Sequence, residues 1–120
     1  MPVDNRAIAD ILDAIGELLD VKGEVVFKTR AYHKAAQVIA GWPEPMDRVV
    51  EQRRLETIPG VGRAIADKVE TLVQTGHLPF YEKLRAEFPE GMLSLMGVPG
   101  VGPKTAFRIS KELGIQNPEE

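Results

Sequence analysis

Two stretches of the chain share a residue pattern that suits the binding of an anion. The sequence LETIPGVGRAIADKV recurs in outline as LMGVPGVGPKTAFRI, with Pro59 and Pro99 lying 40 residues apart. In each copy, proline followed by glycine predicts a type II turn, because proline presets φ and glycine accepts a positive φ. The second glycine of each copy, Gly62 or Gly102, then falls in the first turn of a helix, where free backbone N–H groups attract anions.

Glycine at these positions lets a phosphate approach the backbone without meeting a β-carbon. We therefore predict that the two loops bind phosphate groups, through Gly60 and Gly62 in one loop and Gly100 and Gly102 in the other. For either loop alone, a tight connection between helices is the plainer alternative. Repetition of the whole apolar-Pro-Gly-Val-Gly pattern favours phosphate binding.

A row of basic residues follows the second loop. Lys104, Arg108 and Lys111 are spaced i, i+4 and i+7, which places them on one face of a helix. Such a stripe suits contact with a phosphate strand, although the same spacing also describes a solvated helical face. Its place directly after a predicted phosphate-binding loop favours the first interpretation.

The composition limits the size and class of the protein. The 120 residues are 43% hydrophobic, which suits one compact domain or two very small ones sharing an interface. The chain has no cysteine and its two histidines, His33 and His77, lie far apart, so we expect neither a disulfide framework nor a structural metal site. The formal net charge of −3 argues against a general polyanion binder. Charge is nevertheless segregated, because Lys28, Arg30 and Lys34 have no acidic residue between them.

Hydrophobic spacing predicts an all-helical chain. Apolar residues recur at helical intervals over 4–21, with Asp4 as the expected N-cap and Gly23 as the break that follows. The second helix is expected at 27–41, where it buries Ala31, Ala35, Val38 and Ile39 and ends at Trp42-Pro43. Further helices are expected at 47–54, 62–75, 79–87, 89–96 and 102–113. No segment shows sustained period-2 alternation, so strands are not expected.

The location of the protein is also an expectation from sequence. The first residues show no basic segment followed by an apolar run, and no stretch approaches the roughly 20 apolar residues needed to span a bilayer. We therefore expect a cytoplasmic protein, associated with the nucleoid if bacterial, that makes no contact with a membrane.

The repeated loop resembles the helix-hairpin-helix signature. A longer match covers essentially the whole chain and resembles the N-terminal part of X-family DNA polymerases. It consists of three segments, in the order FKTRAYHKAAQVIAGWP, IPGVGRAIADKVETLVQTGHLPFYEKL and VPGVGPKTAFRI. The resemblance implies a compact all-α fold, with a lyase-like unit at 1–77 that carries the first hairpin and a second hairpin unit at 78–120. No pair of aspartates in a strand context offers a two-metal centre, so the polymerase palm region is expected elsewhere in a longer chain.

The same resemblance implies the partner of the chain. It implies gapped, nicked or 5′-phosphorylated DNA, bound without sequence specificity because backbone contacts carry little sequence information. Lys28 and Tyr32 correspond to residues that bind the 5′-phosphate, and they lie one helical turn apart.

The one catalytic activity implied for this chain is that of a lyase. Lys68 corresponds to a lysine that removes a 5′-deoxyribose phosphate by β-elimination through a Schiff base, which requires no metal or organic cofactor. A lysine attacks an aldehyde only as the neutral amine, and nearby cations or partial burial would lower its pKa. Apart from the resemblance, a solvated helix lysine is the simpler interpretation.

A Na⁺ or K⁺ ion is implied at each hairpin, held by main-chain carbonyl oxygens. The implied ligands are the carbonyls of Glu56, Ile58 and Val61 in the first hairpin and of Met96, Val98 and Val101 in the second.

The chain departs from the family pattern around the phosphate site. Two lysines of the pattern are replaced here by Glu56 and Ala64, and a histidine is replaced by Phe27, so the pocket is less cationic. Arg63 is the candidate to compensate for one of these losses in binding the 5′-phosphate. Glu56 would repel a phosphate unless its side chain turns away.

A different class of function is a protein-interaction or scaffold domain built on tandem helix-hairpin-helix units. The acidic face of the first predicted helix, which includes Asp13 and Glu17, would then be the contact surface. Three aromatic residues, Phe80, Tyr81 and Phe88, are expected to close the interface between the two hairpin units.

Overall fold

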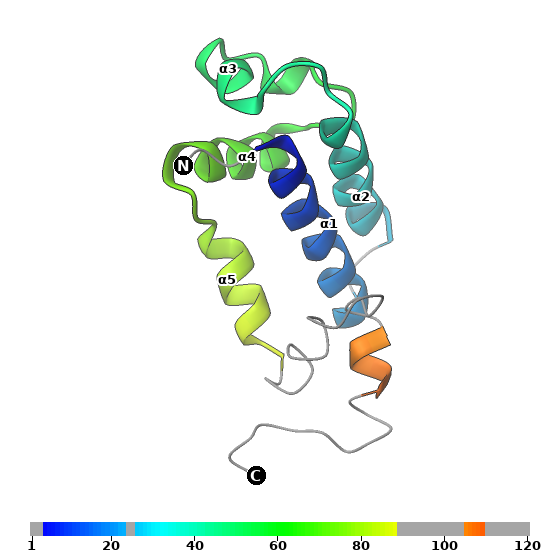
Figure 1. The fold of residues 1–120 in the computed structure, drawn as a ribbon. Helices are drawn as coiled ribbons and strands as arrows, with labels where there is room; N and C mark the ends of the chain where they lie inside the picture. Colours follow the sequence, from blue (N-terminus) through cyan, green and yellow to red (C-terminus); the bar gives the residue numbers. More distant parts are fainter. Residues whose placement is uncertain (1–3, 24–25, 89–104, 110–120) are drawn as a thin grey trace.

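The computed structural model describes residues 4–23, 26–88 and 105–109. Every regular element in these ranges is helical (Figure 1), which confirms the all-α prediction. The elements are α1 (Asn5–Lys22), α2 (Val26–Ala40), α3 (Met46–Glu51), the 3₁₀ helix η1 (Leu55–Thr57), α4 (Arg63–Thr75) and α5 (Pro79–Ala86). Residues 105–109 are helical as well. The other residues of the two C-terminal helices expected at 89–96 and 102–113 lie outside the described ranges.

The ends of α1 follow from its sequence. Asp4 accepts a hydrogen bond from the Ala7 N–H at 2.8 Å, which confirms it as the N-cap. Gly23 ends the helix with φ at 87°, in the left-handed region that glycine adopts without steric cost. Between these caps, one face of α1 places Ile8, Leu12 and other apolar side chains in the core.

Helices α1 and α2 pack side by side and run in opposite directions (Figure 1). Their close approach depends on Gly16, because a β-carbon there would lie 3.2 Å from the Thr29 carbonyl oxygen. The Nδ1 atom of His33, on α2, is paired with Asp13, on α1. The prediction that Ala31 is buried was wrong. Burial on α2 follows Tyr32, Ala35, Ala36 and Ile39, and Ala31 lies to one side of this stripe.

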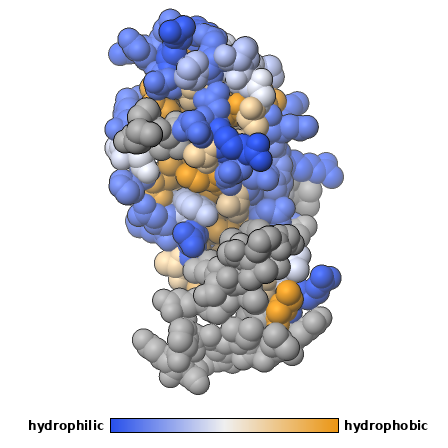
Figure 2. Space-filling view, viewed as in Figure 1, coloured by the Kyte–Doolittle hydropathy of each residue, from blue (hydrophilic) through white to orange (hydrophobic). Residues whose placement is uncertain are grey.

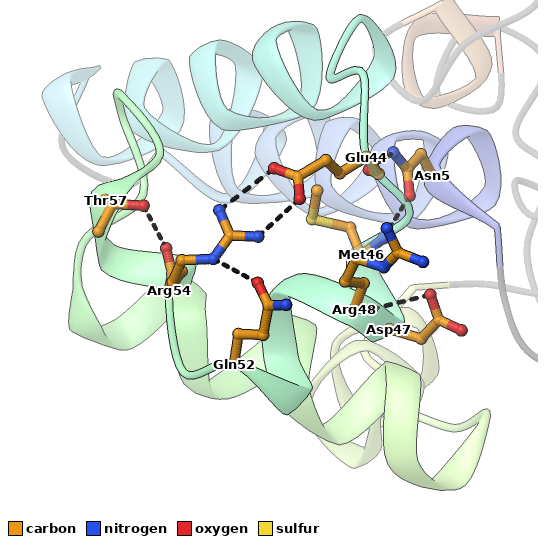
Figure 3. A network of polar contacts seen from close by, with 8 residues as sticks. All are labelled: Asn5, Glu44, Met46, Asp47, Arg48, Gln52, Arg54 and Thr57. Carbon is orange, nitrogen blue, oxygen red and sulfur yellow. Dashed lines mark hydrogen bonds and ion pairs between the residues drawn. The ribbon is translucent and has the colours of Figure 1, made fainter.

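A network of polar contacts holds the connection from α2 to the first hairpin (Figure 3). Asn5 donates to the Glu44 carbonyl and accepts from the Met46 N–H, both at 2.8 Å, and so ties the start of α1 to the start of α3. Arg54 forms a two-pronged pair with Glu44, at 2.6 and 3.2 Å, and also donates to Gln52. This hydrogen-bonded pairing with Arg54 lowers the pKa of the Glu44 carboxyl.

The remaining helices complete the core around α1. Helix α4 packs on α3 and η1, and α5 packs on α1. Leu78 and Leu84, from the start and middle of the α5 segment, are buried, and Ala106 belongs to the same core cluster. Figure 2 shows hydrophobic residues between α1 and α5, surrounded by hydrophilic ones. Within the described ranges, no helix is long and apolar enough to cross a bilayer.

Asn5→Ala should destabilise the fold by about 1–3 kcal/mol, because it leaves a part-buried carbonyl and N–H without partners. Urea unfolding followed by circular dichroism measures this. Gln37→Ala is the control, since it truncates an exposed polar side chain on α2 and should change stability by no more than about 0.5 kcal/mol. Equal midpoints for the two variants would show that the Asn5 contacts do not hold the connection.

Candidate functional site

The first hairpin has the turn that its sequence predicts. The Ile58 carbonyl accepts a hydrogen bond from the Val61 N–H at 3.0 Å, which closes a four-residue turn around Pro59 and Gly60. Gly60 has φ at 87°, as the third position of a type II turn requires. The expected turn is therefore confirmed for this copy of the repeat.

Gly62 has a different reason to be glycine. It is the N-cap of α4, its φ of −87° and ψ of −179° suit any residue, and a β-carbon there would meet no atom within 4 Å. No side chain caps this helix, and its first internal hydrogen bond runs from the Ala66 N–H to the Gly62 carbonyl at 2.8 Å. The fold does not require glycine here, yet glycine leaves open space beside the uncapped N–H groups of α4.

The carbonyls predicted to hold a monovalent cation at the first hairpin lie outside regular helical hydrogen bonding, and their role as ligands stays a prediction. Glu56 lies three residues before Pro59, which has no N–H, so the 3₁₀ pattern of η1 cannot continue onto the Glu56 carbonyl. The Ile58 carbonyl accepts one hydrogen bond and keeps a second lone pair. Val61 precedes the N-cap of α4, so its carbonyl lies outside the helix.

The second hairpin lies mostly outside the described residues. This applies to the predicted backbone contacts Gly100, Gly102, Lys104 and Lys111, and to the cation ligands Met96, Val98 and Val101. Of the predicted basic stripe, Arg108 is described, and it is exposed on a helical segment whose Ala106 is buried.

Lys28, Tyr32 and Lys68 come together in one cavity. This cavity of about 320 Å³ is lined by residues of α1, α2 and α4 and by a further group from α5 and the residue after it. Lys68, on α4, is far in the sequence from Lys28 and Tyr32, which lie one turn apart on α2. The cavity therefore brings the predicted phosphate-binding and nucleophilic residues to one place.

Lys68 lies between two aromatic rings. Its Nζ atom is 4.5 Å from the centroid of the Phe80 ring and 5.9 Å from that of Tyr32, and it lies 3.4 Å from the Ala64 carbonyl oxygen. Burial lowers the pKa of the Lys68 ammonium, and the nearby Asp67 carboxylate opposes this shift. Lys68 thus has the partly desolvated environment in which a lysine becomes a better nucleophile.

Tyr32 forms the inner wall of the cavity. Its side chain is buried, and burial raises the pKa of its phenol, against the opposing effect of the Lys28 ammonium. Tyr32 therefore stays a neutral hydrogen-bond donor at ordinary pH. Lys28 is exposed at the mouth of the cavity, where a charged ligand can reach it.

Sequence reasoning missed the part of the cavity that α5 supplies. Phe80 is 40% exposed, and its ring lies beside the Lys68 ammonium. Most of the second hairpin unit lies outside the described residues, so the interface predicted for Phe80 stays a prediction. Lys83 also lines the cavity, as does Glu87, which pairs with Lys22 at 2.7 Å. Positions 80, 83, 84 and 87 have the spacing of one helical face. This spacing is the sequence pattern that predicts a shared surface for the four residues.

Two residues considered for the phosphate site, one as a repelling and one as a binding group, are not among the residues that line this cavity. Glu56, the acidic residue that would repel a phosphate, lines a different cleft together with Arg53, Asp67 and Glu70. Arg63 is exposed in the first turn of α4 and is not part of the cavity lining described here. Its role in binding a 5′-phosphate stays a prediction.

The pKa of Lys68 should lie below the ordinary value of a lysine, because its ammonium is partly desolvated beside two aromatic rings. A pH titration of the lysine εCH₂ signals by NMR measures this pKa, with the Lys68 signal assigned by its loss in Lys68→Gln. The neutral fraction of Lys68 should therefore begin to rise at a lower pH than that of an ordinary lysine. An ordinary lysine pKa at Lys68 would show that the rings do not exclude water from the ammonium.

Comparisons with known proteins agree with this architecture. Residues 3–78 match the model of the helix-hairpin-helix domain, and residues 92–120 match that of a SAM-like helix-hairpin-helix tandem. The chain is 30% identical to the DNA polymerase/3′-5′ exonuclease PolX of Bacillus subtilis over 115 residues, which are 95% of this chain and 20% of that protein.

Two eukaryotic proteins are similar over most of the chain. DNA polymerase lambda of Arabidopsis thaliana is 32% identical over 106 residues, 88% of this chain and 19% of that protein. DNA polymerase lambda of Rattus norvegicus is 29% identical over 103 residues, 85% of this chain and 17% of that protein. The chain thus spans about a fifth of the length of these relatives. It belongs to the helix-hairpin-helix domain family, and nearly its whole length is homologous to part of the X-family DNA polymerases.

Proposed function

We propose that the chain is a DNA-binding module of an X-family repair polymerase, and that it binds phosphates of the DNA backbone without sequence specificity. Gly62 is the observation that carries this proposal. The fold does not need glycine at this position. Glycine instead leaves space for an anion to approach the uncapped N–H groups at the start of α4. The homology to PolX and to DNA polymerase lambda supports DNA as the source of that anion.

We further propose gapped or nicked DNA with a 5′-phosphate as the preferred form. A strand end differs from continuous duplex by its terminal phosphate and by the absence of stacked neighbours, so it can enter a cavity. Lys28 at the mouth and the Tyr32 phenol on the inner wall offer an ammonium and a neutral hydrogen-bond donor to this phosphate. Glu56, which would repel it, lines another cleft.

A Na⁺ or K⁺ ion fits this proposal at the first hairpin. The carbonyls of Glu56, Ile58 and Val61 would hold it, and its positive charge would add to the attraction of the α4 N-terminus for a phosphate.

Gly62→Ala should weaken DNA binding about 10-fold or more, because its β-carbon blocks charge-assisted hydrogen bonds to the phosphate. It should change the free energy of unfolding by less than about 0.5 kcal/mol, since its backbone suits alanine and the lower entropy of the unfolded chain offsets the poorer N-cap. Fluorescence anisotropy with a one-nucleotide-gapped duplex, with and without a 5′-phosphate, measures binding over a salt series.

Gly60→Ala is the matched comparison. Its positive φ should make it lose about 1–2 kcal/mol of stability, measured by urea unfolding. Wild-type binding should fall steeply with salt and favour the 5′-phosphorylated gap. Binding by Gly62→Ala that equals wild type on every DNA would contradict the assignment of the first hairpin.

A second candidate function is that of a 5′-deoxyribose phosphate lyase. The observation in its favour is the environment of Lys68, which lies between two rings, with its pKa lowered by burial, in the cavity that also holds Lys28. The neutral Nζ would add to the C1′ aldehyde carbon, and loss of water would give an imine. Removal of a C2′ proton would then break the C3′–O bond, and the DNA would leave with its 5′-phosphate.

Lys68→Gln should abolish the covalent adduct that borohydride forms with incised abasic DNA, because it removes the amine that burial partly desolvates beside two rings of the cavity. The wild-type yield should rise with pH as Lys68 loses its proton. Lys83→Gln is the control and should keep most of the adduct, since this lysine is exposed. An adduct that survives Lys68→Gln would remove Lys68 from the role of nucleophile.

The alternative of a scaffold domain would use the acidic face of α1 as its contact surface. Asp13 is paired with His33 of α2, and a Glu17 oxygen lies 3.9 Å from the other ring nitrogen of His33. Both carboxylates therefore contact α2 of the same chain, and this contact is one reason for acidic residues at these positions. DNA binding therefore remains the function we propose.

A further inference from the structure

We propose that Lys34 is a DNA-phosphate contact of the first hairpin, held there by its own side chain packing on Gly60. The proposal rests on the proposed DNA-binding function and adds to it a residue from a different helix. Lys34 lies on α2, 26 positions before Gly60, and belongs to neither the hairpin nor the Lys68 cavity.

The stem of Lys34 lies along the turn. A β-carbon built on Gly60 would be 3.1 Å from Cγ of Lys34, 3.5 Å from Cδ and 3.6 Å from Cε. Three successive methylene groups therefore lie beside the position that a Gly60 β-carbon would occupy. Gly60 has two reasons to be glycine, because its φ is positive and because a side chain would displace the Lys34 stem.

This packing fixes where the charge of Lys34 can lie. Its Nζ atom is one bond of about 1.5 Å beyond Cε, so the ammonium lies within about 5 Å of the Gly60 β-carbon position. The Cα atoms of Gly60 and Gly62 are at most two peptide units, about 7 Å, apart. One stretch of phosphodiester backbone can therefore meet both the α4 N–H groups beside Gly62 and the Lys34 ammonium.

The ammonium is also available to a ligand. Lys34 is exposed, and among the described residues no carboxylate is paired with it. In contrast, Arg54 is paired with Glu44, and Arg6 is paired with Asp10. A lysine whose stem is packed and whose charge is unpaired loses little conformational freedom when it binds a phosphate.

The test compares Lys34→Met with wild type. Methionine keeps an unbranched apolar stem on Gly60 and removes the charge. We expect about five-fold weaker binding to a short duplex at about 0.1 M salt, and a slope of log K against log salt that is smaller by about 0.9. The urea midpoint should stay at the wild-type value. Lys34→Arg should restore most of the slope.

Arg6→Met is the matched control, because it removes one positive charge from an exposed pair on α1 and should leave the slope unchanged. A slope for Lys34→Met equal to that of wild type would overturn the assignment of Lys34 and leave the hairpin proposal standing. If wild type itself does not bind the duplex, the proposed function fails, and the role of Lys34 fails with it.

Discussion

An α-helix cannot satisfy the N–H groups of its own first turn, and the first hairpin of this chain depends on that constraint. Most helices meet it with a capping side chain, as α1 does with Asp4. Helix α4 begins at Gly62 without such a cap, directly after the turn that Pro59 and Gly60 form. The turn and the core position the helix start, and the missing cap leaves its amides for an anion.

The rest of the fold holds this helix start in place. Glu44 and Arg54 pair between the end of α2 and the approach to η1, and Asn5 ties the same connection to α1 (Figure 3). The hairpin itself has few buried side chains, Ile58 and Val61 being the apolar residues that flank the turn. Its geometry is therefore set by contacts made on both sides of it.

The Lys68 ammonium experiences two opposing effects in its cavity. The Phe80 and Tyr32 rings exclude water, which disfavours the ammonium, while their faces attract a cation. Burial has the larger effect on the pKa of Lys68, and the Asp67 carboxylate opposes it. A strongly cationic pocket would bind phosphate more tightly. This pocket instead places an aromatic ring against the lysine.

The sequence by itself determined the helices, the capping of α1 by Asp4 and the turn around Gly60, because these features depend on residues within a few positions of one another. The order of motifs along the chain also predicted Lys28, Tyr32 and Lys68 as residues of one site, and the structure places all three in one cavity. Only the tertiary structure decided that Phe80 covers Lys68 and that Lys34 lies on Gly60. Both contacts join separate elements, and such contacts depend on how the helices pack around α1, which local spacing does not encode.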